Sequence, residues 1–353
     1  MLDLPVVWAE DVLEHVPGAE IWVGVSTPGT ELPERATVIR DAVVAAGASL
    51  VPATSHGDEI LRSVHGDGLL RHLESIHDAW VAGGYPLEPG QQNVVPYVFP
   101  TAGMLDGLPQ REPVATHARA GLYCYDTMTL VGAGTWRAAR AAVDAALTAA
   151  DLVAAGAHVA YAICRPPGHH ATRDAFGGSC YLNNAAVAAS ALRAAGVDRV
   201  AIIDVDAHHG NGTQALFYAS ADVFYGSVHV DPGAGWFPHY AGFADETGRG
   251  AGCGANRNIP LDPGTGDEGW LVGLTELCAA AHAFGAQAVV VSLGVDAAAD
   301  DPESPLAVTL DGYRRTGSII SELDVPVVAV HEGGYHLPTL GALTVETLIG
   351  LSH

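Results

Sequence analysis

The chain has 353 residues, of which 49% are hydrophobic, enough to fill the core of one large α/β domain or of two smaller ones. Its 16 basic residues are outnumbered by 40 acidic ones, which gives a formal net charge of −24. Because nucleic-acid binding depends on basic patches, this balance argues against nucleic acid as a partner. It favours a cationic small molecule or a basic peptide, and it also keeps a cytosolic protein in solution.

Cysteine usage and the start of the chain predict a reducing compartment. The five cysteines are scattered, without a CxxC pair, at Cys124, Cys164, Cys180, Cys253 and Cys278. The first residues, Met1–Pro17, are acidic and lack the basic start and the apolar stretch of a secretion signal. No apolar run approaches the roughly 20 residues that span a bilayer. We therefore expect a cytoplasmic protein that does not contact membranes.

The first part of the chain predicts helices followed by an irregular segment. The first eighty residues show helical patterns in pieces, notably Glu34–Ala46 and Asp58–Ala82. The segment Tyr85–Leu122 is rich in Pro and Gly and too long for an ordinary connection, which indicates a functional loop or an interface arm. The Ala-rich stretch Trp136–Ala154 then predicts a helix, with Thr135 as its N-cap.

From residue 161 to residue 334, apolar stretches alternate with helical patterns, as in a βαβ series with a largely parallel sheet. Strands buried on both faces are expected at Ala160–Cys164, Val200–Ile203, Val223–Val228, Ala288–Leu293 and Pro326–Val330. Helices are expected at Asn183–Ala195, Glu268–Phe284 and Leu310–Leu323. Since no repeat or linker marks a second domain, we predict one α/β domain over residues 1–353, with a mostly parallel central sheet flanked by helices.

Polar residues follow each predicted strand directly. The five strand ends lead into RPPGHH (165–170), DVDAHHGN (204–211), His229, GVD (294–296) and HEGGY (331–335). In open α/β sheets the ligand site lies beyond the carboxyl ends of the strands. Two aspartates, three or four histidines and a tyrosine should therefore meet at one edge of the sheet.

One set of these residues has the chemistry of a metal site. Asp206 and His208 are two residues apart in an extended segment, so that both can face one ion, and Asp296 can supply a third ligand. Two carboxylates and one imidazole leave an open position, as a catalytic zinc requires, although iron(II) or manganese also suits oxygen ligands. Two-metal enzymes of the arginase type need further carboxylates where Gly210 and Gly294 stand, so a single metal is expected.

A second set suits proton transfer. His169 and His170 are adjacent on a Pro-Pro-Gly turn, and Asp204 and Asn211 are available as partners for their rings. A histidine backed by a carboxylate is more basic than one backed by an amide. The pair can therefore supply one residue that transfers protons and one electrostatic helper. Tyr335 follows two glycines and can direct its hydroxyl toward a developing oxyanion.

These motifs resemble the histone deacetylase superfamily, which has the arginase/deacetylase fold. The matching segments are Arg165–His170, CYLNNA (180–185), DVDAHHGNGTQ (204–214), Ser292–Pro302 and Glu332–Tyr335, with Pro33-Glu34-Arg35 near the start. Within the superfamily, the order of the motifs and the 85–122 insertion look most like the bacterial acetylpolyamine amidohydrolases. The similarity covers nearly the whole chain.

The resemblance implies a role for each residue of the two sets. His170 would be the general base toward a water activated at the metal and then the general acid, with His169 beside it, hydrogen-bonded to Asp204. Tyr335 would bind the carbonyl oxygen. Asn211 stands where histone-directed members often carry Asp, whereas amidohydrolase-like and class II members carry Asn. Zinc is implied at Asp206, His208 and Asp296. Structural potassium is implied at Asp204, Asp206, His208, Ser227 and Val228, and a second potassium at Phe217, Ser220 and Val223.

The resemblance also implies residues that bind the substrate. Glu303 has the spacing of a gatekeeper Glu in the eukaryotic polyamine-deacetylating member, where it pairs with a distal ammonium, although a solvated loop acid would look the same. Ser179, next to Gly178, stands where an aromatic residue usually flanks the tunnel, so the tunnel would be wider here. Asp126 is the one carboxylate of the stretch 113–143 and is the acid expected to line the tunnel.

The function implied is a zinc-dependent amidohydrolase that deacetylates small N-acetylated amines, most of all acetylpolyamines. The same chemistry on acetyllysine proteins or on a natural-product amide is the alternative. A non-catalytic protein that binds an acyl ligand would require a broken catalytic set, and the set is complete. In bacterial relatives the insertion also builds a homodimer, which we expect here too.

Overall fold

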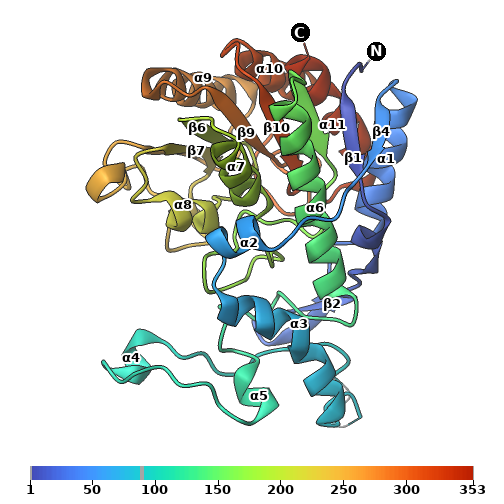
Figure 1. The fold of residues 1–353 in the computed structure, drawn as a ribbon, viewed down its shortest axis with the longest axis vertical. Helices are drawn as coiled ribbons and strands as arrows, with labels where there is room; N and C mark the ends of the chain where they lie inside the picture. Colours follow the sequence, from blue (N-terminus) through green and yellow to red (C-terminus); the bar gives the residue numbers. More distant parts are fainter. Residues whose placement is uncertain (1, 88–90, 353) are drawn as a thin grey trace.

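The computed structural model describes residues 2–87 and 91–352. Its centre is an eight-stranded sheet in which neighbouring strands run parallel, in the order β4-β1-β5-β10-β9-β6-β7-β8 (Figure 1). The strands are β1 (Pro5–Trp8), β4 (Ser49–Pro52), β5 (Val159–Ala162), β6 (Val200–Asp204), β7 (Val223–Val230), β8 (Asn256–Leu261), β9 (Ala288–Leu293) and β10 (Val327–His331). The predicted α/β fold with a mostly parallel sheet is confirmed.

Helices cover both faces of the sheet. On one face α6 (Thr135–Ala154) and α7 (Asn184–Ala194) lie side by side, and on the other α1, α11, α10 and α9 pack in series. The bounds of the remaining helices are α1 (Glu34–Ala45), α2 (Glu59–Val64), α3 (Asp67–Ala82), α8 (Asn211–Phe217), α9 (Asp267–Phe284), α10 (Leu310–Ser321) and α11 (Leu337–Leu351). Among the described residues, no helix has the length and hydrophobicity that crossing a bilayer requires.

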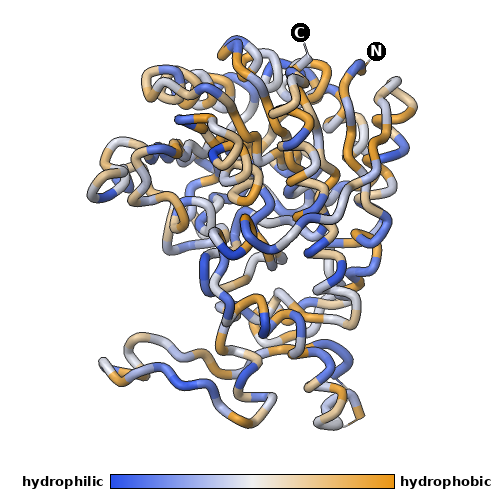
Figure 2. The backbone as a smooth tube through the Cα atoms, viewed as in Figure 1, coloured by the Kyte–Doolittle hydropathy of each residue, from blue (hydrophilic) through white to orange (hydrophobic). Residues whose placement is uncertain are grey.

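The core of the molecule lies at the central strands. All residues of β5, β6, β7, β9 and β10 are buried, and Figure 2 shows these strands as largely hydrophobic. A strand covered by helices on both faces excludes water from both sets of its side chains, which is why it is a continuous apolar run in the sequence. The five predicted strands all form within two residues of their expected bounds.

Two local predictions are wrong. Thr135 does not cap α6: it is the first residue of the helix, and its Oγ1 instead accepts a hydrogen bond from the Gly132 amide at 2.8 Å. The helical pattern over 58–82 forms two helices that are separated at His65-Gly66. His65 is buried there, with Nδ1 donating to the Thr172 carbonyl at 2.9 Å, and this tertiary contact interrupts the helix.

Several elements have no counterpart in the sequence predictions. They are the edge strands β4 and β8, the strand β1 beside β4, the antiparallel hairpin of β2 (Ala19–Trp22) and β3 (Val25–Pro28), and the helices α8 and α11. The strands β1 to β4 have only four residues each, three of them include a proline, and β3 and β4 are largely exposed. Such strands exist because a neighbour pairs with them, and no local pattern encodes that neighbour.

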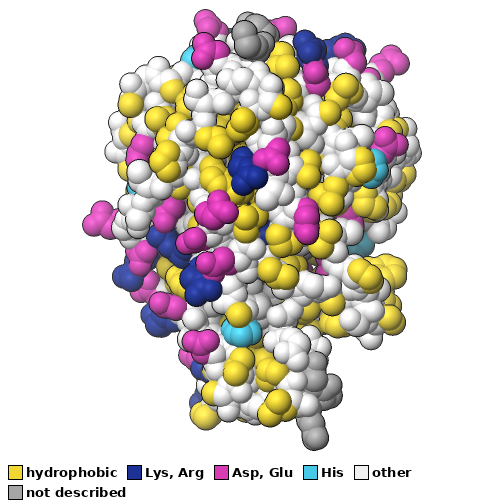
Figure 3. Space-filling view, turned by 90° about the vertical axis from the view of Figure 1, so that its right-hand side faces the viewer, with side chains coloured by type: hydrophobic (Ala, Val, Ile, Leu, Met, Phe, Trp, Pro, Cys, Tyr) yellow, Lys and Arg dark blue, Asp and Glu magenta, His cyan; other side chains and the backbone are white. Residues whose placement is uncertain are grey.

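The 85–122 insertion forms an arm at the end of the molecule opposite the chain termini (Figure 1). It contains the short helices α4 (Ala102–Leu105) and α5 (Thr116–Arg119), and α5 packs against α3. Figure 3 shows hydrophobic side chains on the narrow lower part of the molecule, to which α3 and the arm contribute. Residues 88–90 of the insertion lie outside the described residues.

Candidate active site

The carboxyl ends of four adjacent strands, β5, β10, β9 and β6, bring the predicted site residues together. His169 and His170 follow β5, Asp204 ends β6, and both Asp206 and His208 lie just beyond it. Asp296 follows β9 and Tyr335 follows β10. Because the strands run parallel, residues distant in the sequence meet at one edge, as the sequence analysis expects.

Asp206, His208 and Asp296 converge on one point. His208 Nδ1 lies 3.3 Å from Asp206 Oδ1 and 3.1 Å from Asp296 Oδ2, and one ligand atom from each of the three lies within 4.8 Å of the others. Backbone amides fix both carboxylates, since Gly333 donates to Asp206 and Ala207 donates to Asp296, each at 2.7 Å. Burial raises the pKa of Asp296, and the negative Asp206 adds to the rise. A cation bound among them would relieve this repulsion, so the residues fit a single metal ion.

The two adjacent histidines have different partners and opposite acid–base properties. His169 Nδ1 lies 3.1 Å from Asp204 Oδ2, and His170 Nδ1 lies 2.8 Å from Asn211 Oδ1. Burial lowers the pKa of His169, but the charges of Asp206 and Asp204 outweigh it and raise that pKa to about 10. Burial, together with the nearby His169 and His208, holds the pKa of His170 well below its usual range. At neutral pH, His169 is therefore charged and His170 is neutral.

Tyr335 lies on a loop that is held in place by contacts with Arg35. Arg35 is buried, stacks over the Tyr335 ring at 4.5 Å and donates hydrogen bonds to the carbonyls of Gly334 at 2.6 Å and Glu332 at 2.5 Å. Burial raises the pKa of Tyr335 well above its ordinary value, although Arg35 acts in the opposite direction. The phenol therefore stays protonated and can donate a hydrogen bond.

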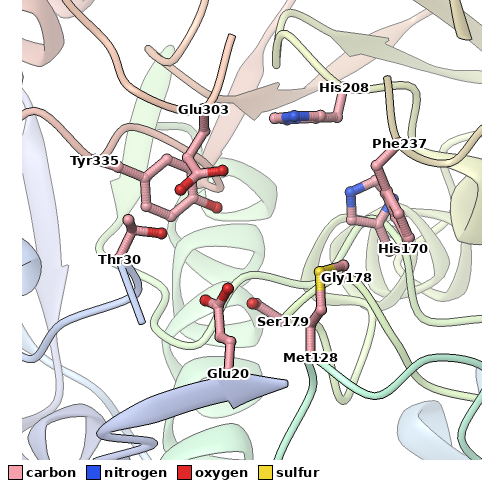
Figure 4. Close-up of a pocket in the computed structure, with 10 residues that line it drawn as sticks. All are labelled: Glu20, Thr30, Met128, His170, Gly178, Ser179, His208, Phe237, Glu303 and Tyr335. Carbon is pink, nitrogen blue, oxygen red and sulfur yellow. The ribbon is translucent and has the colours of Figure 1, made fainter. Parts of the chain in front are cut away.

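A pocket opens onto these groups (Figure 4). His170, His208 and Tyr335 line it together with three of the expected substrate-binding residues, Gly178, Ser179 and Glu303. Four further lining residues were not predicted from the sequence, namely Glu20, Thr30, Met128 and Phe237. None of these four belongs to a strand-end motif, so the sequence offers no signal for them beyond the acidity of Glu20.

Glu20 brings a second carboxylate to the pocket that contains Glu303. In Figure 4 the two side chains come from different segments and point toward the middle of the pocket. Burial first, and then the charge of Glu303, raise the pKa of Glu20 to about 7. Both carboxylates line the same pocket, and a positively charged ligand placed between them would relieve their repulsion.

Asp126, and the residues expected at potassium sites other than Asp204, Asp206 and His208, lie outside this pocket. Asp126 is not among the lining residues of this pocket and borders a neighbouring hollow instead. Asp204 and Ser227 are register partners on β6 and β7, and Val228 follows Ser227 in β7. In the turn from α8 to β7, the Ser220 amide donates to the Phe217 carbonyl at 2.8 Å and the Val223 amide donates to Ser220 Oγ at 3.2 Å.

The fold and this arrangement agree with comparisons to known proteins. Residues 30–350 match the histone deacetylase domain, and the chain belongs to the histone deacetylase family. The predicted enzyme class, a deacetylase that hydrolyses amides, is confirmed.

Several relatives are similar over nearly their whole length. An acetylpolyamine amidohydrolase of Mycoplana ramosa is 42% identical over 348 residues, which cover 98% of this chain and 99% of the relative. Acetylpolyamine amidohydrolase 2 of Pseudomonas aeruginosa is 39% identical, with 98% and 97% covered. The crystal structure of an acetylpolyamine aminohydrolase from Burkholderia pseudomallei superposes with a TM-score of 0.91 at 39% identity and covers 99% of this chain and 98% of its own. The predicted resemblance to bacterial acetylpolyamine amidohydrolases is confirmed.

Proposed function

We propose that this chain is a metal-dependent amidohydrolase that removes acetyl groups from small N-acetylated amines, above all acetylpolyamines. The composition of one pocket carries the proposal, because His170, His208 and Tyr335 line it together with the carboxylates of Glu20 and Glu303. An acetylated polyamine has an amide that His170, His208 and Tyr335 can act on, and a distal ammonium that the two carboxylates can bind. The names of the relatives agree with this substrate class.

Asp206, His208 and Asp296 would hold the catalytic metal. We propose zinc, which suits two carboxylates and one imidazole with an open position, and iron(II) is the alternative. When bound, the metal would polarise the amide carbonyl and lower the pKa of water. Structural potassium is proposed at the two sets of residues around Ser227 and Ser220.

His170 would transfer the proton in both halves of the reaction. The Asn211 amide oxygen can only accept a hydrogen bond, so Nδ1 of His170 carries the hydrogen and Nε2 is left with its lone pair. His170 Nε2 takes a proton from the attacking water as the water oxygen bonds to the carbonyl carbon. It then gives this proton to the amide nitrogen as the C–N bond breaks, and acetic acid and the neutral amine leave; the acid then loses its proton to the amine, which gives acetate and an ammonium ion.

His169 and Tyr335 would stabilise charge without transferring protons. His169 donates to Asp204 and carries a positive charge beside the reacting atoms. The neutral phenol of Tyr335 donates a hydrogen bond to the carbonyl oxygen as negative charge develops on it. Arg35 holds the Tyr335 loop in place for this contact.

We further propose that residues 1–353 form one cytoplasmic deacetylase domain that pairs with a second copy through the arm. Exposed apolar side chains on the arm support the pairing: Tyr97 is 71% exposed, Met104 64%, Leu108 69% and Val114 97%. Light scattering should show a dimer that Leu108→Asp converts to a monomer, whereas Val272→Asp, on α9 and 66% exposed, should leave the dimer intact. A monomeric wild-type protein at micromolar concentration would refute the pairing.

Acetate release tests the catalytic proposal. The protein should release acetate from N-acetylputrescine, lose this activity to a chelator and regain it with added zinc. Binding of the amide without acetate release, in protein shown to contain zinc, would instead indicate a non-catalytic binder. Recovery with iron(II) but not with zinc would change the metal and leave the reaction standing.

A further inference from the structure

Asp126 lies at the centre of a hydrogen-bonded turn that touches several walls of the pocket. Its Oδ1 accepts from the amides of Met128 at 2.9 Å and Thr129 at 2.8 Å. Its Oδ2 accepts from Thr129 Oγ1 at 3.1 Å and from the Gly178 amide at 2.6 Å. Four bonds fill the acceptor positions of a carboxylate, so no oxygen lone pair is left for a substrate ammonium.

The hydrogen bond from Gly178 to Asp126 holds a turn that packs directly against the ring of His170. Gly178 and Ser179 both have left-handed backbone, at φ 58° and 61°, a conformation that is costly for Ser179 unless surrounding contacts hold it. The Ser179 amide donates to Thr129 Oγ1 at 2.8 Å, which supplies such a contact. A side chain at position 178 would collide with the rings of His170 and Phe237, so the backbone of this turn lies directly against both.

Residues next to Asp126 in the chain form hydrogen bonds to two other parts of the pocket. Thr127 Oγ1 donates to the Ile21 carbonyl at 2.6 Å, which ties down the strand that carries Glu20. Tyr125 Oη donates to the His170 carbonyl at 2.9 Å. The segment 125–129 thus links three parts of the pocket: the Glu20 strand, the Gly178-Ser179 turn and the backbone of His170.

We propose that Asp126 is a positioning residue, which holds the Gly178-Ser179 turn against His170 and Phe237 and does not bind the charge of the substrate. This role differs from the substrate-binding one that the resemblance implies. It rests on the proposed deacetylase function of the pocket. Glu303 and Glu20 are then left as the carboxylates that face the ammonium.

A charged and a neutral substrate with the same four-carbon chain separate the two roles. N-acetylputrescine has a distal ammonium, and N-butylacetamide lacks it. Asp126→Asn should lower kcat/KM by about tenfold or more for both amides alike, because misplaced catalytic groups slow any substrate. The KM of the neutral amide should rise, which mere loss of folded protein would not cause. Glu303→Leu should affect the charged amide alone.

Loss confined to the charged amide, or no loss for either, would overturn the proposal. If Asp126→Asn does not fold, Thr129→Val and Thr129→Ser decide, since only serine keeps the hydroxyl that joins Asp126 to Ser179. Equal activity of these two variants would contradict the proposal. If the wild type hydrolyses neither amide, the proposed function fails. In that case, crystal structures of the wild type and of Asp126→Asn test the positioning role without an activity measurement. A Gly178-Ser179 turn in the same position in both structures would refute it.

Discussion

His169 and His170 are neighbours in the chain, yet the structure gives them opposite charge states. Burial lowers the pKa of both, but at His169 the charges of Asp206 and Asp204 outweigh it, whereas at His170 burial and the nearby His169 and His208 outweigh the charge of Asp206. A single buried site can therefore offer a fixed positive charge and a free base side by side. The partners Asp204 and Asn211 could be named from the sequence because they follow the same strand, whereas the pKa shifts depend on burial that only the fold defines.

Replacement of His170 tests its role in proton transfer. His170→Ala leaves the three metal ligands in place, so its metal content should match that of the wild type. Turnover should fall by about 10²-fold or more, the usual scale for loss of an acid–base group. Metal analysis and acetate release measured on the same sample check both statements. Near-normal turnover would remove His170 from the mechanism.

The pKa of Glu20 predicts how substrate binding depends on pH. Because this pKa is raised to about 7, Glu20 becomes neutral as the pH falls through 7 and no longer attracts a cation. The KM of N-acetylputrescine should therefore rise several-fold between pH 8 and pH 6, while the KM of neutral N-butylacetamide should not. Glu20→Gln should have a high KM at both pH values. If Glu20→Gln kept the pH dependence of the wild type, Glu20 would not be its source.

At the scale of elements, the chain encodes the buried strands and their polar ends far better than the edges of the molecule. The strands β5, β6, β7, β9 and β10 are continuous apolar runs, so both their positions and the residues that follow them could be predicted. Glu20 belongs to the β2–β3 hairpin, and its approach to Glu303 depends on how the hairpin packs. No periodicity encodes such a contact between distant segments, which is why the second carboxylate was missed.

The buried His72 on helix α3 should make the folded protein less stable in acid. His72 is buried on this helix, Nε2 has no hydrogen-bond partner in the described structure, and burial first and Arg119 second lower its pKa to about 4. In the unfolded chain the pKa of His72 is near 6.5, so between pH 6.5 and pH 4 His72 is protonated in the unfolded chain and neutral in the folded protein. Stability should therefore fall as the pH drops from 6.5 toward 4, with about 2 kcal/mol at pH 5 due to His72.

Thermal unfolding of His72→Phe checks this expectation. A phenyl ring fills the same site between Tyr123 and Phe176 and cannot titrate. The variant should therefore lose less stability than the wild type between pH 7 and pH 5. His77→Gln is the matched control, because His77 is only half-buried on the same helix. Parallel pH profiles for wild type and His72→Phe would show that the acid sensitivity lies elsewhere.

At the scale of the whole molecule, the excess of 24 negative charges and the two carboxylates of the pocket favour the same kind of ligand. An acidic surface raises the local concentration of cations, and Glu20 and Glu303 would bind them at the site. The sequence predicted the charge and the enzyme class, while the shape of the pocket required the fold. Both features therefore favour small cationic amides as substrates.

A comparison of kcat/KM across four substrates tests that claim most directly. The zinc-loaded protein would be offered N-acetylputrescine, N-acetylcadaverine, N8-acetylspermidine and an acetyllysine peptide, with acetate release as the common measure. The account predicts a preference of about tenfold or more for the acetylpolyamines, since an ammonium placed between two partly buried carboxylates contributes at least that factor. Faster turnover of the peptide would contradict it and indicate a protein deacetylase. Weak turnover of all four would contradict it in favour of another amide, admitted by the space beside Ser179.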